Sequence, residues 1–151
     1  MLGSLARWLR ILDYDTEYVR FSDDDELIAW SNAEGRVLLT KDRRLAARRA
    51  VHRVLLIRGA TLGAQIREVL AFTGDDPRRR LLFRRCLECN RILREIPPAE
   101  AAPEVPPYVF RTQRRFLRCP ACRKIYWAGT HRSHMLERLR RLLDEPEPGR
   151  G

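Results

Sequence analysis

The sequence predicts an α/β fold with a parallel sheet, followed by a smaller module that contains all four cysteines. In the first half, short apolar stretches alternate with segments of helical periodicity, and this alternation is typical of a three-layer arrangement with helices on both faces of a parallel sheet. In the second half, basic residues and cysteines replace this pattern. A turn at 74–77 separates the two parts, so we predict domains at 1–78 and 79–151.

The elements of the first half follow from periodicity and capping residues. Leucines at helical spacing predict an amphipathic helix over 2–12. After it we expect a strand at 16–19, a helix at 24–33 capped by Asp24, a buried strand at 36–40, a helix through Leu45 to about Ala50, a strand at 54–57 and a helix at 61–72. A sheet of this kind normally starts with a strand, whereas this chain starts with a helix. Either the sheet is built without that strand, or the chain begins downstream of a true start, which we favour.

Two further elements are expected in the second half of the chain. The proline-rich stretch 96–107 lies between the two cysteine pairs and predicts an extended loop. The stretch 134–143 predicts a basic amphipathic helix.

Composition excludes several classes of protein. A hydrophobic fraction of 44% is that of a globular protein rather than of a disordered one. No apolar run approaches the roughly 20 residues that cross a bilayer, and the N-terminal stretch lacks the features of a signal peptide. We therefore expect a cytoplasmic protein that does not enter a membrane.

The charge of the chain points to a polyanionic partner. The net charge is +10, and residues 1–75 hold 12 basic and 11 acidic side chains, whereas residues 76–151 hold 18 and 9. A cationic surface of this kind favours nucleic acid, chiefly through phosphate contacts and counterion release. The alternative is an arginine-rich surface that is only solvated.

The cysteine spacing predicts one structural zinc ion. Cys86 and Cys89 form one C-x-x-C pair, and Cys119 and Cys122 form another. Two such pairs supply four thiolates to one tetrahedral centre and leave no position open for catalysis. The alternatives are weaker, because two disulfides would need an oxidising compartment and a redox motif would use a single pair.

Aromatic and histidine side chains follow the second cysteine pair. His131 and His134 are possible zinc ligands in place of a cysteine, although four thiolates already suffice. Tyr126 and Trp127 either face RNA together with the nearby arginines or pack beside the metal.

Carboxylates of the first half are candidates for a second metal site. Asp42 follows the strand at 36–40, at the carboxyl end where open parallel sheets place their sites, and Asp24 begins the helix at 24–33. Asp25 and Glu26 are nearby alternatives. Clustered carboxylates hold Mg²⁺ or Mn²⁺ in metal-dependent nucleases. Helix capping and solvated charge explain the same residues without catalysis.

Several blocks of the sequence resemble the Mut-seven C-terminal ribonuclease family, a PIN-like domain with an appended zinc ribbon. The resemblance lies in MLGSLARWLRIL (1–12), GRVLLTKDR (35–43), CLECN (86–90) and CPACRKIYWAGTH (119–131). It implies a PIN-like three-layer fold and a metal-dependent ribonuclease whose acidic residues meet at one site. Onto this chain it carries Asp24 and Asp42 as ligands of Mg²⁺ or Mn²⁺.

The chain departs from the family pattern at two points. Asp13 stands where the family usually has a glycine, and an aspartate can take the left-handed conformation there. The family's first strand and its aspartate come just before the residue that matches Met1, and they are absent from this sequence. Without that ligand we expect a weakened metal site and low or no activity of the chain as given.

The function we predict is a metal-dependent endoribonuclease whose zinc ribbon helps to bind RNA. The candidates for phosphate binding are exposed arginines of the first helix and of the stripe after Asp42, namely Arg7, Arg10, Arg43, Arg44, Arg48, Arg49 and Arg53. Two other functions fit the same features. One is a non-catalytic RNA- or ribosome-binding zinc-ribbon protein, and the other is a partner-binding component of a toxin–antitoxin or RNA-processing assembly.

Overall fold

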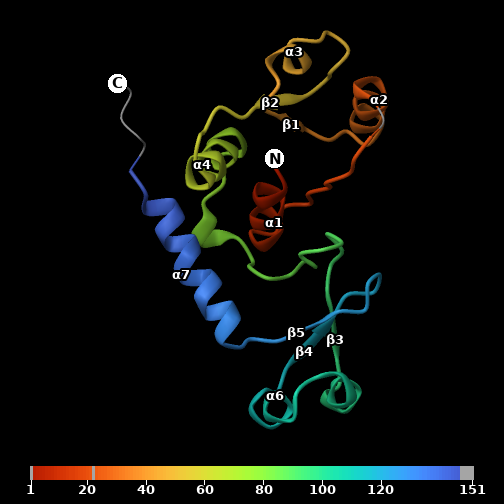
Figure 1. The fold of residues 1–151 in the computed structure, drawn as a ribbon, viewed down its shortest axis with the longest axis vertical. Coiled ribbons are helices and arrows are strands. Elements are labelled where there is room, and N and C mark those ends of the chain that lie inside the picture. The colour runs from red at the N-terminus through yellow and green to blue at the C-terminus, as the bar shows by residue number, and fades with distance from the viewer. Residues whose placement is uncertain (1, 22, 147–151) are drawn as a thin grey trace.

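A computed structural model describes residues 2–21 and 23–146 of the chain, which adopt a mixed α/β fold with two small sheets (Figure 1). In the first sheet, β1 (Leu38–Thr40) and β2 (Val54–Leu56) run parallel, and Leu39 pairs with Leu55. In the second sheet, β3 (Arg94–Ile96), β4 (Phe116–Arg118) and β5 (Ile125–Tyr126) run antiparallel in the order β3-β4-β5.

Helices surround the two sheets and connect their strands. In chain order they are α1 (Gly3–Ile11), α2 (Asp24–Ala33), α3 (Arg43–Ala46), α4 (Leu62–Thr73), the 3-10 helix η1 (Pro77–Arg79), α5 (Pro98–Ala101), the 3-10 helix η2 (Ala102–Glu104), α6 (Pro107–Thr112) and α7 (Thr130–Asp144). Within the described part of the chain, no helix has both the length and the apolar composition that a membrane span requires.

The strand predicted at 16–19 is wrong, because these residues form an extended segment outside both sheets. The backbone N–H of Thr16 donates to Oδ1 of Asn90 at 2.9 Å instead of to a neighbouring strand. The described residues therefore leave the parallel sheet with two strands, and β1 has a strand partner on one edge only.

Three helical predictions also need correction. Asp23, not Asp24, is the N-cap of α2, and its side chain accepts from the N–H of Glu26 at 2.8 Å. The helix after β1 is shorter than predicted and ends at Ala46. Helix α7 begins at Thr130, a full turn before the predicted start.

The proline-rich stretch 96–107 is not an extended loop. It contains α5 and η2, and it ends where α6 begins. Prolines occupy the first helical turn of each of these elements, where the missing N–H has no intrahelical partner to lose. Proline content alone therefore did not predict these short helices.

Three left-handed residues end helices in the first half of the chain. Gly35 follows α2 with φ of +64°, Gly74 caps α4 with φ of +74°, and Asp13 follows α1 with φ of 65°. Glycine takes this conformation freely, and aspartate is among the few other residues that adopt it readily. The turn after α1 is therefore made by an aspartate, as predicted.

The main hydrophobic core joins both halves of the chain. Its buried residues come from α1, from the segment after β2, from α4, from the first cysteine pair and from α7: Leu5, Trp8, Leu9, Ile11, Leu12, Ile57, Ile66, Val69, Leu70, Leu87, Leu139 and Leu142. Helix α7 packs against α4 (Figure 1). The Arg67 guanidinium of α4 donates to the carbonyl oxygen of Leu142 at 2.9 Å.

Candidate functional site

The two cysteine pairs form similar turns. The first turn lies between η1 and β3, and the second follows β4. In the first turn the N–H of Asn90 donates to the carbonyl of Cys86 at 2.9 Å, and in the second the N–H of Arg123 donates to the carbonyl of Cys119 at 3.0 Å. Asn90 and Arg123 are both left-handed, with φ of 66° and 69°. Each pair thus ends in the tight turn that a metal-binding knuckle requires.

The four thiols converge on one point. The Sγ atoms of Cys86, Cys89, Cys119 and Cys122 all lie within 4.8 Å of one another, and those of Cys86 and Cys122 are 3.6 Å apart. Four sulfurs at about 2.3 Å from a zinc ion stand about 3.8 Å apart in a regular tetrahedron. All four cysteines are free rather than paired in disulfides. The donor set and its spacing therefore fit a metal ion such as zinc, bound by four thiolates.

The electrostatics of the thiols also favour a cation. Burial raises the pKa of Cys86, but the Tyr126 hydroxyl and backbone N–H groups outweigh it and lower the value to about 7. Burial and the neighbouring thiols raise the pKa of Cys89 to about 12. Four thiols this close cannot all ionise beside one another unless a positive ion offsets their repulsion.

Tyr126 supports the metal centre instead of facing outward. Its hydroxyl lies 3.2 Å from Sγ of Cys86 and accepts from the N–H of Leu87 at 3.2 Å. Trp127 packs at the edge of a second core cluster. His131 and His134 are exposed at the start of α7 and lie outside the cysteine group.

Asn90 connects the metal centre to the first half of the chain. This side chain is buried, and its amide donates to Oδ1 of Asp15 at 2.7 Å and to Oε1 of Glu17 at 3.2 Å. Its amide contacts depend on residues more than 70 positions away, so sequence spacing contains no signal for them.

The two candidate aspartates lie at helix starts on the surface. Asp42 follows β1 and caps α3, and its Oδ1 accepts from the N–H groups of Arg44 at 2.8 Å and Leu45 at 3.2 Å. Asp24 is the first residue of α2 and is exposed. The four cysteines are the only group of three or more potential ligands that the structure brings together within residues 2–21 and 23–146.

The predicted arginines divide into exposed and buried residues. Arg43, Arg44, Arg48, Arg49 and Arg53 are exposed on α3 and the loop after it. The guanidinium of Arg48 is hydrogen-bonded to Asp25, and this contact raises the pKa of Arg48. This contact places Arg48, in the middle of the exposed arginine group, beside the acidic first turn of α2.

Arg10 does not belong to an RNA-facing surface. Its side chain is 8% exposed, and the guanidinium donates to the carbonyl oxygens of Thr16 at 2.8 Å and Leu87 at 2.7 Å. The helical pattern placed Arg10 off the apolar stripe, but the first cysteine turn covers this face of α1. Arg7 remains exposed, with a 3.9 Å ion pair to Glu88.

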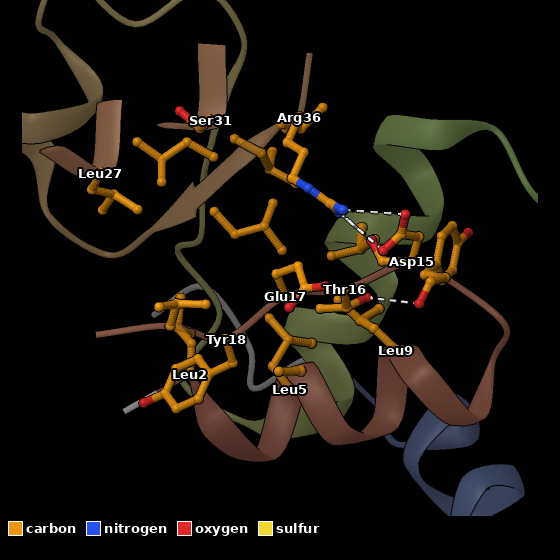
Figure 2. A pocket seen from close by; sticks show the side chains of 18 of the residues that line it. Leu2, Leu5, Leu9, Asp15, Thr16, Glu17, Tyr18, Leu27, Ser31 and Arg36 are labelled. Carbon is orange, nitrogen blue, oxygen red and sulfur yellow. Dashed lines mark hydrogen bonds and ion pairs between the residues drawn. The ribbon is translucent and has the colours of Figure 1, made fainter. Parts of the chain in front are cut away.

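A largely apolar cavity of about 370 Å³ lies between the extended segment 14–19, α1, β1 and α4. Figure 2 shows Leu2, Leu5 and Leu9 along one side, and Arg36 reaching toward Asp15 on another. Arg36 donates to Oδ1 of Asp15 at 3.0 Å. The segment predicted as a strand and β1 both line this cavity and do not pair.

One of three comparisons with known proteins gives a match. The family model described as the Mut7-C RNAse domain matches residues 1–139 of the chain. No curated protein and no solved structure shows a significant match.

Proposed function

The chain belongs to the Mut7-C RNAse domain family, and on this premise we propose that it is a metal-dependent endoribonuclease that hydrolyses RNA phosphodiester bonds. The single observation that carries the proposal is the match of the family model over residues 1–139. It covers both the α/β half and the cysteine half, so the proposal assigns both to one RNA-directed function. The PIN-like three-layer fold, the division at residue 78 and a cytoplasmic location are part of the same proposal.

Asp42 and Asp24 are the proposed ligands of a catalytic Mg²⁺ or Mn²⁺ ion. When bound, the ion supplies Lewis-acid polarisation of the scissile phosphate and a water of lowered pKa. The support for Asp42 is its exposed carboxylate directly after β1, where its capping bonds use Oδ1. Oδ2 makes no such bond to the first turn of α3, so it is the oxygen we assign to the ion.

The cysteine half is the proposed anchor for RNA. Zinc would hold the two turns together, and the basic residues of this half would bind phosphates. The exposed arginines after Asp42 are the proposed phosphate contacts beside the aspartates. Because Arg48 is paired with Asp25, we assign the larger share of phosphate binding to Arg43 and Arg44.

A non-catalytic RNA-binding protein is the second candidate. One observation favours it: among the described residues, neither Asp24 nor Asp42 belongs to a group of three or more side chains that could hold a metal. Two carboxylates leave a divalent cation with mostly water ligands, and such a site binds weakly.

A single-turnover cleavage assay separates the two candidates. Zinc-loaded protein in excess over 5′-labelled RNA is incubated without added divalent ions, with Mg²⁺ or with Mn²⁺, and its zinc content is measured before and after. The endoribonuclease proposal predicts internal cuts that need Mg²⁺ or Mn²⁺ while zinc stays bound. Retained RNA binding without any metal-dependent cleavage would favour the second candidate.

A further inference from the structure

A second cavity lies in the cysteine half. It measures about 410 Å³, and residues of α6, β5 and the first turn of α7 are part of its lining. This volume falls within the range of about 300–1,000 Å³ that is usual for ligand pockets. We call it the ribbon groove.

Cations but no carboxylates line the ribbon groove. Its charged lining consists of Arg7, Arg85, Arg115, Lys124 and Arg132. The carboxylates that approach them lie outside the lining. Asp13 is 3.2 Å from Arg85, and this mostly buried pair neutralises Arg85. The other pairs are exposed, so they neutralise little of the field: Glu88 is 3.9 Å from Arg7 and 4.0 Å from Lys124, and Glu95 is 3.5 Å from Arg115. The groove is therefore complementary to an anion.

Aromatic side chains form part of the same lining. Tyr108 on α6 is 63% exposed, which leaves most of its ring without a protein neighbour. Trp127 is half-buried, and the Arg132 guanidinium lies over the ring of Phe83 at 4.8 Å from its centroid. Rings beside cations are the combination that binds unpaired bases and their phosphates, because every base has a face that can stack.

We propose that the ribbon groove binds single-stranded RNA. Bases stack on Tyr108 and Trp127, and phosphates lie against Arg115, Lys124 and Arg132. A duplex does not fit, since its bases are stacked on one another and a cavity of this size admits only unstacked bases. The inference rests on the proposed RNA-directed function and deepens it, because it names the form of RNA that the cysteine half takes.

The test measures binding of the full zinc-loaded chain by fluorescence anisotropy. The probes are a labelled 12-nucleotide oligouridine, an RNA hairpin of the same length and a labelled polyglutamate peptide. Each groove variant has a matched control nearby. Tyr108→Ala is compared with Phe110→Ala, because Phe110 is also exposed on α6. Arg115→Gln is compared with Arg114→Gln, because Arg114 is exposed beside it in the loop between α6 and β4. Tyr108→Phe keeps the ring, and zinc content shows that each variant is folded.

We expect Tyr108→Ala to weaken oligouridine binding about fivefold or more, while Tyr108→Phe and Phe110→Ala bind like the parent. Arg115→Gln lowers the dependence of binding on salt, by about 0.7 in the logarithmic slope, and Arg114→Gln lowers it less. Binding of the hairpin is weaker than that of oligouridine.

Three results would contradict the proposal that the ribbon groove binds single-stranded RNA. Equal effects of Tyr108→Ala and Phe110→Ala would show that RNA binds elsewhere, and the proposed nuclease function would survive that result. Polyglutamate binding with the same dependence on Tyr108 would identify an acidic peptide as the ligand. A parent protein that binds none of the RNA probes would contradict both the groove and the proposed function.

Discussion

The Arg10 guanidinium donates a 2.7 Å hydrogen bond to the carbonyl oxygen of Leu87 and so joins α1 to the first cysteine turn. The two residues are 77 positions apart, and both are buried. Together with Asn90, this contact makes the cysteine half part of the same packed body as the α/β half. Changes in one half should therefore affect the other.

Replacing Arg10 tests this connection. Arg10→Met removes a buried hydrogen bond to the carbonyl of Leu87 and a partly buried one to the carbonyl of Thr16, so we expect the free energy of unfolding to fall by about 2–3 kcal/mol. Arg7→Met, on the exposed face of the same helix, should change it by less than about 0.5 kcal/mol. Urea unfolding measures both. Equal effects of the two substitutions would show that Arg10 does not tie the halves together.

Gly63 tests the packing of α7 on α4. A Cβ at this position would stand 2.3 Å from the backbone oxygen of Leu142, which has no room to move without shifting α7. We expect Gly63→Ala to destabilise the protein by about 1–3 kcal/mol. Gly3→Ala is the control, because its Cβ would meet Tyr18 at an ordinary 3.5 Å. Thermal unfolding of both variants gives the comparison, and a neutral Gly63→Ala would contradict the packing.

Asp15 predicts a loss of stability at acidic pH. Burial raises the pKa of this carboxyl, but hydrogen bonds from Arg36 and Asn90 outweigh it, and the folded pKa is lowered from 3.8. Because the pKa of Asp15 is lower in the folded state than in the unfolded state, its ionised carboxyl contributes its full stabilisation at pH values above the unfolded-state pKa. That stabilisation is lost as the pH falls through the folded-state pKa. Urea unfolding between about pH 5 and pH 2 should show a smaller decline for Asp15→Asn than for the parent.

Protonation of the thiols affects the parent and Asp15→Asn alike, so it cancels in the difference between them. Glu100→Gln, an exposed carboxylate on α5, controls for the substitution itself. Parallel pH profiles for the parent and Asp15→Asn would show that the Asp15 contacts contribute nothing.

Zinc content tests the cysteine centre. We expect one zinc ion per chain by plasma mass spectrometry, and we expect Cys119→Ser to lose it and to unfold the sheet β3-β4-β5. The same variant should weaken binding of single-stranded RNA, because Lys124 and Tyr126 of the groove follow the second cysteine turn directly. A purified parent with no zinc and two disulfides would contradict the centre.

The local chemistry of the sequence predicted the features that depend on short spacing. The cysteine cluster and the strands β1 and β2 follow from residue type and from neighbours a few positions away. A C-x-x-C pair imposes its own turn, and a buried run of branched residues has few alternatives to a strand.

Contacts between distant segments could not be predicted in this way. Residues 16–19 have the sequence pattern of a strand. In the structure the N–H of Thr16 donates to the side chain of Asn90, and a cavity is lined by this segment on one side and by β1 on another. Helical periodicity predicted that Arg10 faces solvent. Periodicity does not reveal that the cysteine half covers this face of α1. The ribbon groove likewise combines side chains from Arg7 to Met135, which no single motif brings together.

Asp42→Asn gives the most direct test of the claim that this chain is a metal-dependent endoribonuclease. Asparagine caps a helix about as well as aspartate, so the substitution removes the charge while keeping the cap of α3. Asp76→Asn is the matched control, because Asp76 also caps a short helix, η1, on the surface. In the single-turnover assay with Mn²⁺, we predict that Asp42→Asn removes the low cleavage activity expected of the chain as given, while Asp76→Asn leaves that activity unchanged. Cleavage by Asp42→Asn at the parent's rate would contradict the account.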